Sequence, residues 1–135
     1  MIPNPKTIIA LSMLGVVYAL LTVFSLIVGL EHRIALSIII IVGVTAYLTS
    51  TERKLATAFS AGFAVVFVAI WTQIAFHDQY FANNPQYAEV EVPLGLTPIT
   101  YTMLFSPFGA IAGSLIAGAA AVLLHLAWML RRRLR

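Results

Sequence analysis

The sequence has no cysteine and little charge. Among its 135 residues only 10% are Asp, Glu, Lys or Arg, whereas about a quarter of a typical soluble domain is charged. The lack of cysteine excludes disulfides, cysteine nucleophiles, thiolate metal sites and iron–sulfur clusters held by thiolates. With 61% hydrophobic residues and a mean hydropathy of +0.96, the chain cannot cover a water-facing surface. The composition predicts an integral membrane protein with a single domain over residues 1–135.

Charge is also missing from the middle of each apolar segment. We predict four membrane-spanning helices at about residues 5–30, 34–50, 52–76 and 107–130, because a span needs roughly 20 apolar residues. None of the four has Asp, Glu, Lys or Arg in its core. Carriers coupled to protons or cations normally need such a group at membrane depth, so the sequence does not favour that class.

Capping signals mark the starts of three helices. Asn4 precedes Pro5, Thr51 precedes the third apolar segment, and Ser106 precedes Pro107. Asn, Ser and Thr side chains accept hydrogen bonds from the first backbone N–H groups of a helix, and proline suits the first turn. We therefore predict that Asn4, Thr51 and Ser106 are helix caps.

The connections between the helices differ greatly in length. Residues 31–33 and 51–54 form short connections, which make consecutive helices antiparallel neighbours. The third connection, residues 77–106, has about 30 residues, a length that usually has a function or a structure of its own. The predicted fold is an all-α integral membrane protein, an up-down bundle of four transmembrane helices with a long extracytoplasmic loop between helices 3 and 4.

The long loop has internal signals. Asn83-Asn84-Pro85 predicts a turn, and the alternating stretch Tyr87–Val92 predicts a short strand. Thr97 before Pro98 is a further helix start, but one helix from there to residue 130 would measure about 50 Å, more than the roughly 30 Å hydrocarbon core. We predict an interfacial helix over residues 98–105 and a break at Pro107. An aromatic belt at the membrane interface would contain Tyr80, Phe81, Tyr87, Tyr101 and Phe105.

The basic residues predict the orientation, because cytoplasmic segments are enriched in Lys and Arg. One side would carry Lys6, Arg53, Lys54, Arg131, Arg132, Arg133 and Arg135, and the other would carry Arg33 alone. Both termini are therefore predicted in the cytoplasm, with the protein in the plasma membrane of a prokaryote. The C-terminal group Arg131, Arg132, Arg133 and Arg135 would anchor the chain to anionic lipid headgroups rather than bind nucleic acid.

The fourth helix has two stripes of small residues. The first stripe contains Gly109, Gly113, Ala117 and Ala121, and the adjacent stripe contains Ala110, Ser114 and Gly118. Small residues spaced by four allow the backbones of two membrane helices to approach closely. This face could pack within the chain's own bundle, or it could dock on another chain. The sequence leaves both alternatives open.

Histidines are the remaining candidates for chemistry. His77 and Asp78, with Glu89 or Glu91 folded back, could bind a metal through nitrogen and oxygen ligands. No recognised ligand spacing supports this site, and solvated or loop-pinning roles are favoured. His125 could be a haem or quinone ligand, but a lone histidine favours an interfacial hydrogen bond. We predict no catalytic residues, no metal site and no cofactor.

Three functions remain in order of preference. The first is a non-catalytic accessory or scaffold subunit of a larger membrane complex, docking through the small-residue face of the fourth helix and the long loop. The second is a homo-oligomeric channel or small-solute transporter lined by Gln73, Thr72 and that face. The third is a redox or metal-binding enzyme subunit. The expected partners are the lipid bilayer and other membrane subunits, or further copies of the chain.

Overall fold

The computed structural model of the chain describes residues 4–88 and 92–134, and within these residues it contains helices and turns but no strand. The helices that are long and apolar enough to cross a membrane are α1 (Pro5–Val23), α2 (Glu31–Thr49), α3 (Lys54–Ala75) and α6 (Pro98–Arg133). Between α3 and α6 lie α4 (His77–Asn83), α5 (Pro85–Ala88) and the 3-10 helix η1 (Pro93–Gly95). The described chain is that of an all-α, multi-pass membrane protein.

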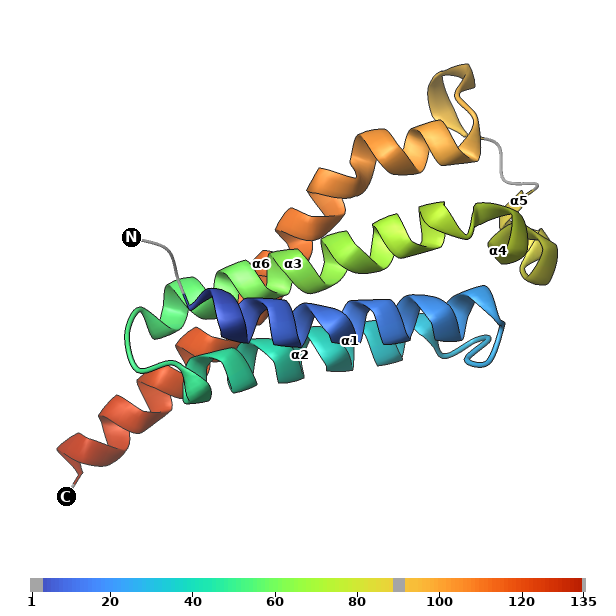
Figure 1. Cartoon of the computed structure of the whole chain (residues 1–135). Helices are drawn as coiled ribbons and strands as arrows, with labels where there is room; N and C mark the ends of the chain where they lie inside the picture. Colours follow the sequence, from blue (N-terminus) through green and yellow to red (C-terminus); the bar gives the residue numbers. More distant parts are fainter. Residues whose placement is uncertain (1–3, 89–91, 135) are drawn as a thin grey trace.

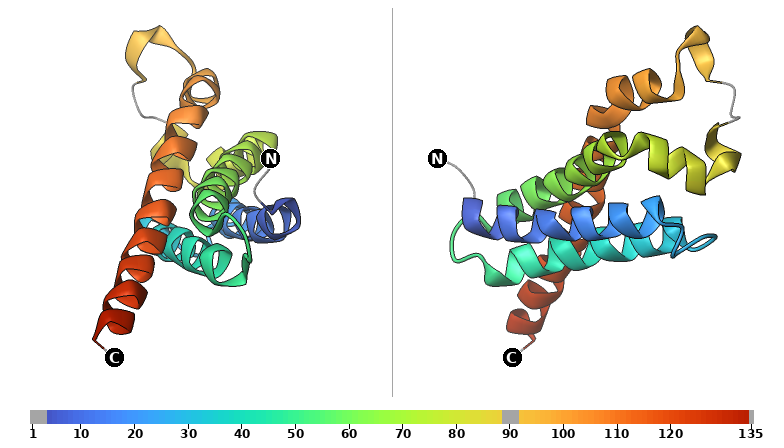
Figure 2. Two further views of the ribbon diagram at one scale, coloured as in Figure 1. Left: turned by 90° about the vertical axis from the view of Figure 1, so that its left-hand side faces the viewer. Right: turned by 45° about the vertical axis from the view of Figure 1, so that its right-hand side comes forward.

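Helix α3 lies at the centre of the arrangement (Figure 1). Helices α1 and α2 run alongside α3, whereas α6 packs against α3 and α2 at an oblique angle in both views of Figure 2. Both chain ends and the α2–α3 connection lie at one end of the molecule, which we call the terminal end. The α1–α2 connection, α4 and α5 lie at the opposite end, the loop end. Three antiparallel helices are thus crossed by a fourth.

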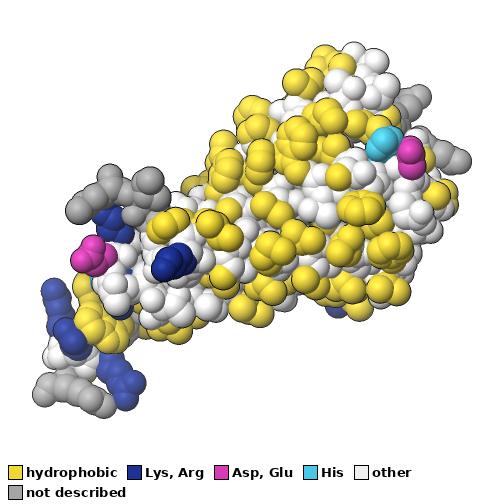
Figure 3. Space-filling model, viewed as in Figure 1, with side chains coloured by type: hydrophobic (Ala, Val, Ile, Leu, Met, Phe, Trp, Pro, Cys, Tyr) yellow, Lys and Arg dark blue, Asp and Glu magenta, His cyan; other side chains and the backbone are white. Residues whose placement is uncertain are grey.

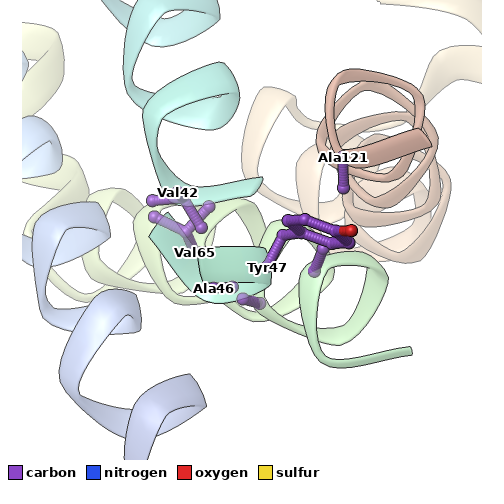
Figure 4. Packing of buried hydrophobic residues seen from close by; sticks show 7 residues of the cluster. Val42, Ala46, Tyr47, Val65 and Ala121 are labelled. Carbon is purple, nitrogen blue, oxygen red and sulfur yellow. The ribbon is translucent and has the colours of Figure 1, made fainter. Parts of the chain in front are cut away.

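The core is made largely of small side chains. Its central cluster contains Val42, Ala46, Tyr47, Ala58, Ala61, Val65 and Ala121, which are shown in Figure 4. Alanine at these positions lets neighbouring backbones come close, so that van der Waals contact between helices replaces interlocking of large side chains. The large apolar side chains Leu104, Phe108, Leu115 and Leu123 point outward and are exposed, as expected where lipid is the solvent.

Helix α1 ends at Val23, well before the predicted end at residue 30. Its last carbonyl groups are bonded by side chains from α4 and the residue after it. Asn84 Nδ2 donates to the Thr22 carbonyl at 3.0 Å, and Asn83 Nδ2 donates to the Val23 carbonyl at 2.7 Å. Ser25 has a left-handed φ of 54° and donates its hydroxyl to the Asn83 carbonyl at 2.7 Å. The Thr22 carbonyl also accepts from the Ser25 backbone N–H at 3.0 Å, so local backbone bonds and the side chains of Asn83 and Asn84 together satisfy the end of this helix.

Of the predicted caps, Asn4 is confirmed and Thr51 is wrong. Asn4 Oδ1 accepts a hydrogen bond from the Thr7 backbone N–H at 3.3 Å. Helix α3 begins at Lys54 instead, after Arg53 in a left-handed conformation with φ of 49°. The guanidinium of Arg53 has no acceptor atom, and its side chain does not cap the helix.

Helix α6 is continuous through Pro107, so the predicted break and separate interfacial helix are wrong. Thr97 caps its start, accepting from the Thr100 backbone N–H at 3.2 Å. Ser106 is inside the helix rather than a cap, and its hydroxyl donates to the Met103 carbonyl at 2.9 Å. That carbonyl would otherwise receive the N–H that Pro107 lacks. The Ser106 hydroxyl therefore replaces the missing bond, and the helix bends in its orange N-terminal part (Figure 1) without ending.

The long connection is mostly helical. The predicted turn at Asn83-Asn84-Pro85 is confirmed as the boundary between α4 and α5. Of the predicted strand Tyr87–Val92, Tyr87 and Ala88 instead form the end of α5, and residues 89–91 lie outside the described residues. The strand is therefore wrong where the structure describes it.

Candidate functional sites at the two ends

The small-residue face of α6 packs inside the chain. A Cβ atom built on Gly113 would lie 2.9 Å from the Gly62 carbonyl oxygen of α3 and would overlap Val66. A Cβ on Gly118 would overlap the ring of Phe59. The neighbours Ala110, Ala117 and Ala121 are fully buried. Packing within the bundle is the alternative that the structure shows, and α3 and α2 leave no room on this face for a second chain.

Gly109 differs from the other members of the stripe. It is only partly buried. A Cβ atom built on it would meet only the end of the Ile70 side chain, at 3.1 Å. The contact between α3 and α6 is therefore looser at Gly109 than at Gly113.

Polar side chains at membrane depth bond within the chain. Gln73 Nε2 donates to Thr22 Oγ1 at 2.7 Å, which ties α3 to α1. The Thr72 hydroxyl donates to the Val68 carbonyl at 2.7 Å. Tyr18 donates to the Glu31 carbonyl at 3.2 Å, joining α1 to the start of α2. Of the two side chains expected to line a channel, Gln73 joins two helices and Thr72 bonds a carbonyl of its own helix.

A pocket at the loop end lies between α3–α5 and the start of α6, with a volume of about 340 Å³. Its polar lining comes from Gln73, His77, Tyr80, Tyr87, Tyr101 and Thr102. The rings of Tyr80 and Tyr87 stack with centroids 6.0 Å apart. Burial, and secondarily the neighbouring Tyr87, raise the pKa of Tyr80 to about 12. Tyr80 is therefore a neutral hydrogen-bonding group at physiological pH.

All residues of the predicted aromatic belt except Phe105 line this loop-end pocket. Tyr80, Phe81 and Tyr87 come from α4 and α5, and Tyr101 and Phe105 come from α6. The row continues along α6, since Tyr101 and Phe105 have centroids 4.4 Å apart and Phe105 and Phe108 5.7 Å apart. The sequence does not indicate that the belt encloses a cavity, because that depends on the path of the loop.

His77 and Asp78 do form a pair at the edge of the pocket. His77 Nε2 lies 2.8 Å from Asp78 Oδ1, and the Asp78 side chain is almost fully exposed. Within residues 4–88 and 92–134, no three His, Asp or Glu side chains gather as a metal site would require. Glu89 and Glu91, the other ligands considered, lie outside the described residues.

A second cavity, the terminal-end groove, has a volume of about 730 Å³. It lies between the end of α2, the start of α3 and the last part of α6, and its lining includes Tyr47, Lys54, His125 and Trp128. The Tyr47 hydroxyl and His125 Nδ1 are 2.6 Å apart, which gives His125 the hydrogen bond favoured from the sequence. Figure 4 shows the Tyr47 ring with its oxygen directed toward α6. No sequence pattern signals this pairing, because the two residues are 78 positions apart.

Basic residues surround the terminal-end groove, and Figure 3 shows their dark blue side chains gathered at this end of the molecule. Lys54 Nζ lies 5.4 Å from the centre of the Tyr47 ring, and the Arg132 guanidinium lies 3.7 Å from the centre of the Trp128 ring. Of the predicted headgroup anchors, Arg131, Arg132 and Arg133 are in the last turn of α6, and Arg135 lies outside the described residues.

No family model, curated protein or solved structure matches this chain. Its function is therefore argued from its own residues.

Proposed function

We propose that the chain is a non-catalytic subunit of a larger membrane protein complex, and that it docks through the arm of α6, residues 98–108, at the loop end. One observation carries this proposal. The arm diverges from α3 (Figures 1 and 2) and carries outward-facing aromatic and apolar side chains, of which Phe108 is 65% exposed. Ser106 lies on the buried side of the arm. The outward side, which the bundle leaves uncovered, is suited to contact with a helix of another subunit.

The aromatic row gives the arm a defined shape. Ring contacts from Tyr101 to Phe105 and from Phe105 to Phe108 restrict these side chains before any partner binds. Aromatic side chains with few rotatable bonds lose little conformational entropy on binding, and they are enriched at the centres of protein interfaces. Pro107 holds the bend that directs the arm away from α3.

Internal hydrogen bonds favour a scaffold over a channel. Gln73 and Thr72, the side chains that a pore would need, donate to Thr22 and to the Val68 carbonyl. The small-residue face of α6, the third part of that pore, lies against α3. A bundle whose polar groups and small-residue face are already used within the chain is better suited to hold a partner in position than to conduct a solute.

The proposal includes an orientation. The terminal end carries Lys6, Arg53, Lys54, Arg131, Arg132 and Arg133, whereas Arg33 lies at the start of α2 toward the loop end. The positive-inside rule then places the terminal end in the cytoplasm and the arm of α6 on the opposite side of a prokaryotic plasma membrane. The partner would meet the arm at that outer interface.

Native mass spectrometry of the assembly, extracted gently from membranes of the source cell, tests the proposal. We expect a stoichiometric species that contains this 14.7 kDa chain and a different polypeptide. Phe108→Ala should release that polypeptide and leave the thermal unfolding of the subunit unchanged, because Phe108 is 65% exposed in the isolated chain.

Leu123→Ala is the matched control, since Leu123 lies on the same helix, is 68% exposed, and is far from the arm. It should leave the complex intact. Species that contain only copies of this chain would contradict the subunit proposal and favour the homo-oligomeric channel. Equal loss of the partner in both variants would contradict the docking surface.

A further inference from the structure

The terminal-end groove has apolar walls and a cationic mouth. Leu48 of α2, Leu55 of α3 and Leu124 of α6 contribute apolar surface, and Trp128 closes one side. Lys54 and Arg53 lie at the start of α3 beside this surface. A soluble anion would use only the positive charges at the mouth, whereas an amphiphile would use both these charges and the apolar walls. The lining is therefore that of a site for an anionic group attached to a hydrocarbon chain.

Two of the cations are held in place by aromatic rings. Lys54 lies over the face of Tyr47 and Arg132 over the face of Trp128. Such cation–π contacts attract the charged groups to the ring faces and reduce the number of rotamers that the long side chains sample. Tyr47 is itself 7% exposed and is fixed by its hydrogen bond to His125. The positive charges are thus positioned before a ligand arrives.

The backbone at the start of α3 adds to the positive field. The first N–H groups of a helix have no partner within the helix, and the helix dipole favours an anion there. Here Arg53 supplies no side-chain cap, and the first-turn residues Lys54, Leu55 and Ala56 all line the groove. Glu52 is the one acidic residue in the α2–α3 connection, and it is followed by two basic residues.

We propose that the terminal-end groove binds the phosphate headgroup of an anionic phospholipid. The phosphate would lie between Lys54 and the start of α3, and an acyl chain would lie against Leu124 and Trp128. Basic pockets between membrane helices on the cytoplasmic side are suited to such headgroups. The site lies at the opposite end of the molecule from the arm of α6. A test of lipid binding can therefore fail or succeed independently of a test of the proposed docking surface.

Fluorescence quenching by brominated lipids tests this site. Trp71→Phe leaves Trp128 as the only tryptophan, since the sequence has two. In nanodiscs, brominated phosphatidylglycerol should quench Trp128 more strongly than brominated phosphatidylcholine at the same mole fraction. Lys54→Gln should reduce this preference about fivefold, because one Lys or Arg near an anionic surface contributes on the order of 1 kcal/mol. Lys54→Arg should restore it.

Lys6→Gln is the control, because it removes the same charge at the same end of the molecule but outside the groove. It should leave the quenching preference unchanged. Circular dichroism of each variant checks that the helices are retained. Equal effects of Lys54→Gln and Lys6→Gln would overturn the proposal, since the preference would then come from general surface charge. Relief of quenching by millimolar inorganic phosphate would also overturn it, because the site would then take free phosphate rather than lipid.

Discussion

Glycine sets the distance between helices at single positions in this molecule. Gly62 and Gly113 face each other where α3 and α6 cross, and Gly43 of α2 lies against the backbone of Ala117. On the other side of α3, a Cβ on Gly15 of α1 would lie 3.2 Å from the Ala69 backbone nitrogen. At each of these contacts an added methyl group would meet backbone atoms of the neighbouring helix, and at Gly113 it would also overlap the Val66 side chain. The helices can separate there only as whole elements.

We expect Gly113→Leu to destabilise the subunit itself. The new side chain would overlap Val66 and the Gly62 carbonyl, and overpacking of this kind commonly costs about 1–3 kcal/mol or more. Unfolding by titration with a denaturing detergent measures the change. Gly109→Ala, on the same stripe, should cost much less because its Cβ would meet only the end of Ile70. A Gly113→Leu protein as stable as the parent would show that α6 does not pack on α3.

Tyr80 gives the molecule a pH dependence in the alkaline range. Its pKa in the folded chain is about 12, against an ordinary value of 10.0, so the folded state holds the phenolic proton more tightly than the unfolded state. The resulting contribution to stability is fully present below pH 10 and is lost as the pH rises toward 12. In Tyr80→Phe this loss should be smaller. Thermal unfolding of both proteins across that range is the measurement, and identical pH profiles would contradict the assignment.

Sequence signals at the residue scale succeed where the partners are close along the chain. The caps at Asn4 and Thr97 each bond a residue three positions away. The bonds from Asn83 and Asn84 to the end of α1 join residues about 60 positions apart. The side chains that bond the last two carbonyl groups of α1 come from another part of the chain, so no motif near Val23 predicts these bonds.

At the scale of the element, α6 shows how a membrane helix can continue through proline. The Ser106 hydroxyl bonds the Met103 carbonyl, and the Ser106 side chain is buried. Ser followed by Pro is typical of a helix start, but the pattern also occurs inside a helix where the hydroxyl bonds backward. The length of one helix from residue 98 to residue 130 is the other reason why the sequence predicts a break at Pro107. A bent helix that crosses obliquely accommodates more residues than an upright one, and the oblique crossing is a tertiary property.

A double-mutant cycle on Ser106 and Pro107 tests this replacement of one hydrogen bond by another. Ser106→Ala should destabilise the parent by about 1 kcal/mol, the usual net contribution of a hydrogen bond. In a Pro107→Ala background the same change should cost less, because the alanine that replaces Pro107 supplies a backbone N–H to the Met103 carbonyl. Detergent unfolding of the four proteins gives the coupling energy. A cost that is equal in both backgrounds would mean that the two residues act independently.

At the scale of the whole molecule, the number of long apolar helices among the described residues follows from hydropathy, because bilayer thickness sets a minimum length for apolar segments. Their ends do not all follow, as α1 and α6 show. The oblique position of α6 does not follow, since it depends on which small residues meet. The same holds for the two cavities. Tyr47 and His125, or Gln73 and Tyr101, come together only when α6 is placed against α2 and α3.

Cysteine labelling of intact cells tests the orientation, and the absence of native cysteine makes each introduced one unique. We expect Arg53→Cys to react only after the membrane is permeabilised and Tyr87→Cys to react from outside. The reason is the excess of Lys and Arg at the terminal end. Arg33→Cys, at an exposed position near the start of α2, serves as a second outer site. The reverse labelling pattern would place the terminal end, with its groove, outside the cell.

The central position of α3 has a consequence for biosynthesis. Helices α1 and α2 contact each other little, and each packs mainly on α3 or α6. When only α1 and α2 have left the ribosome, we expect a loose hairpin, in which the bond from Tyr18 to the Glu31 carbonyl can join the two helices near their turn. The glycine contacts of Gly15 and Gly43 await helices that are translated later. We therefore expect insertion of α3 to be the step at which the nascent chain first acquires a stable tertiary structure, and insertion of α6 to complete it.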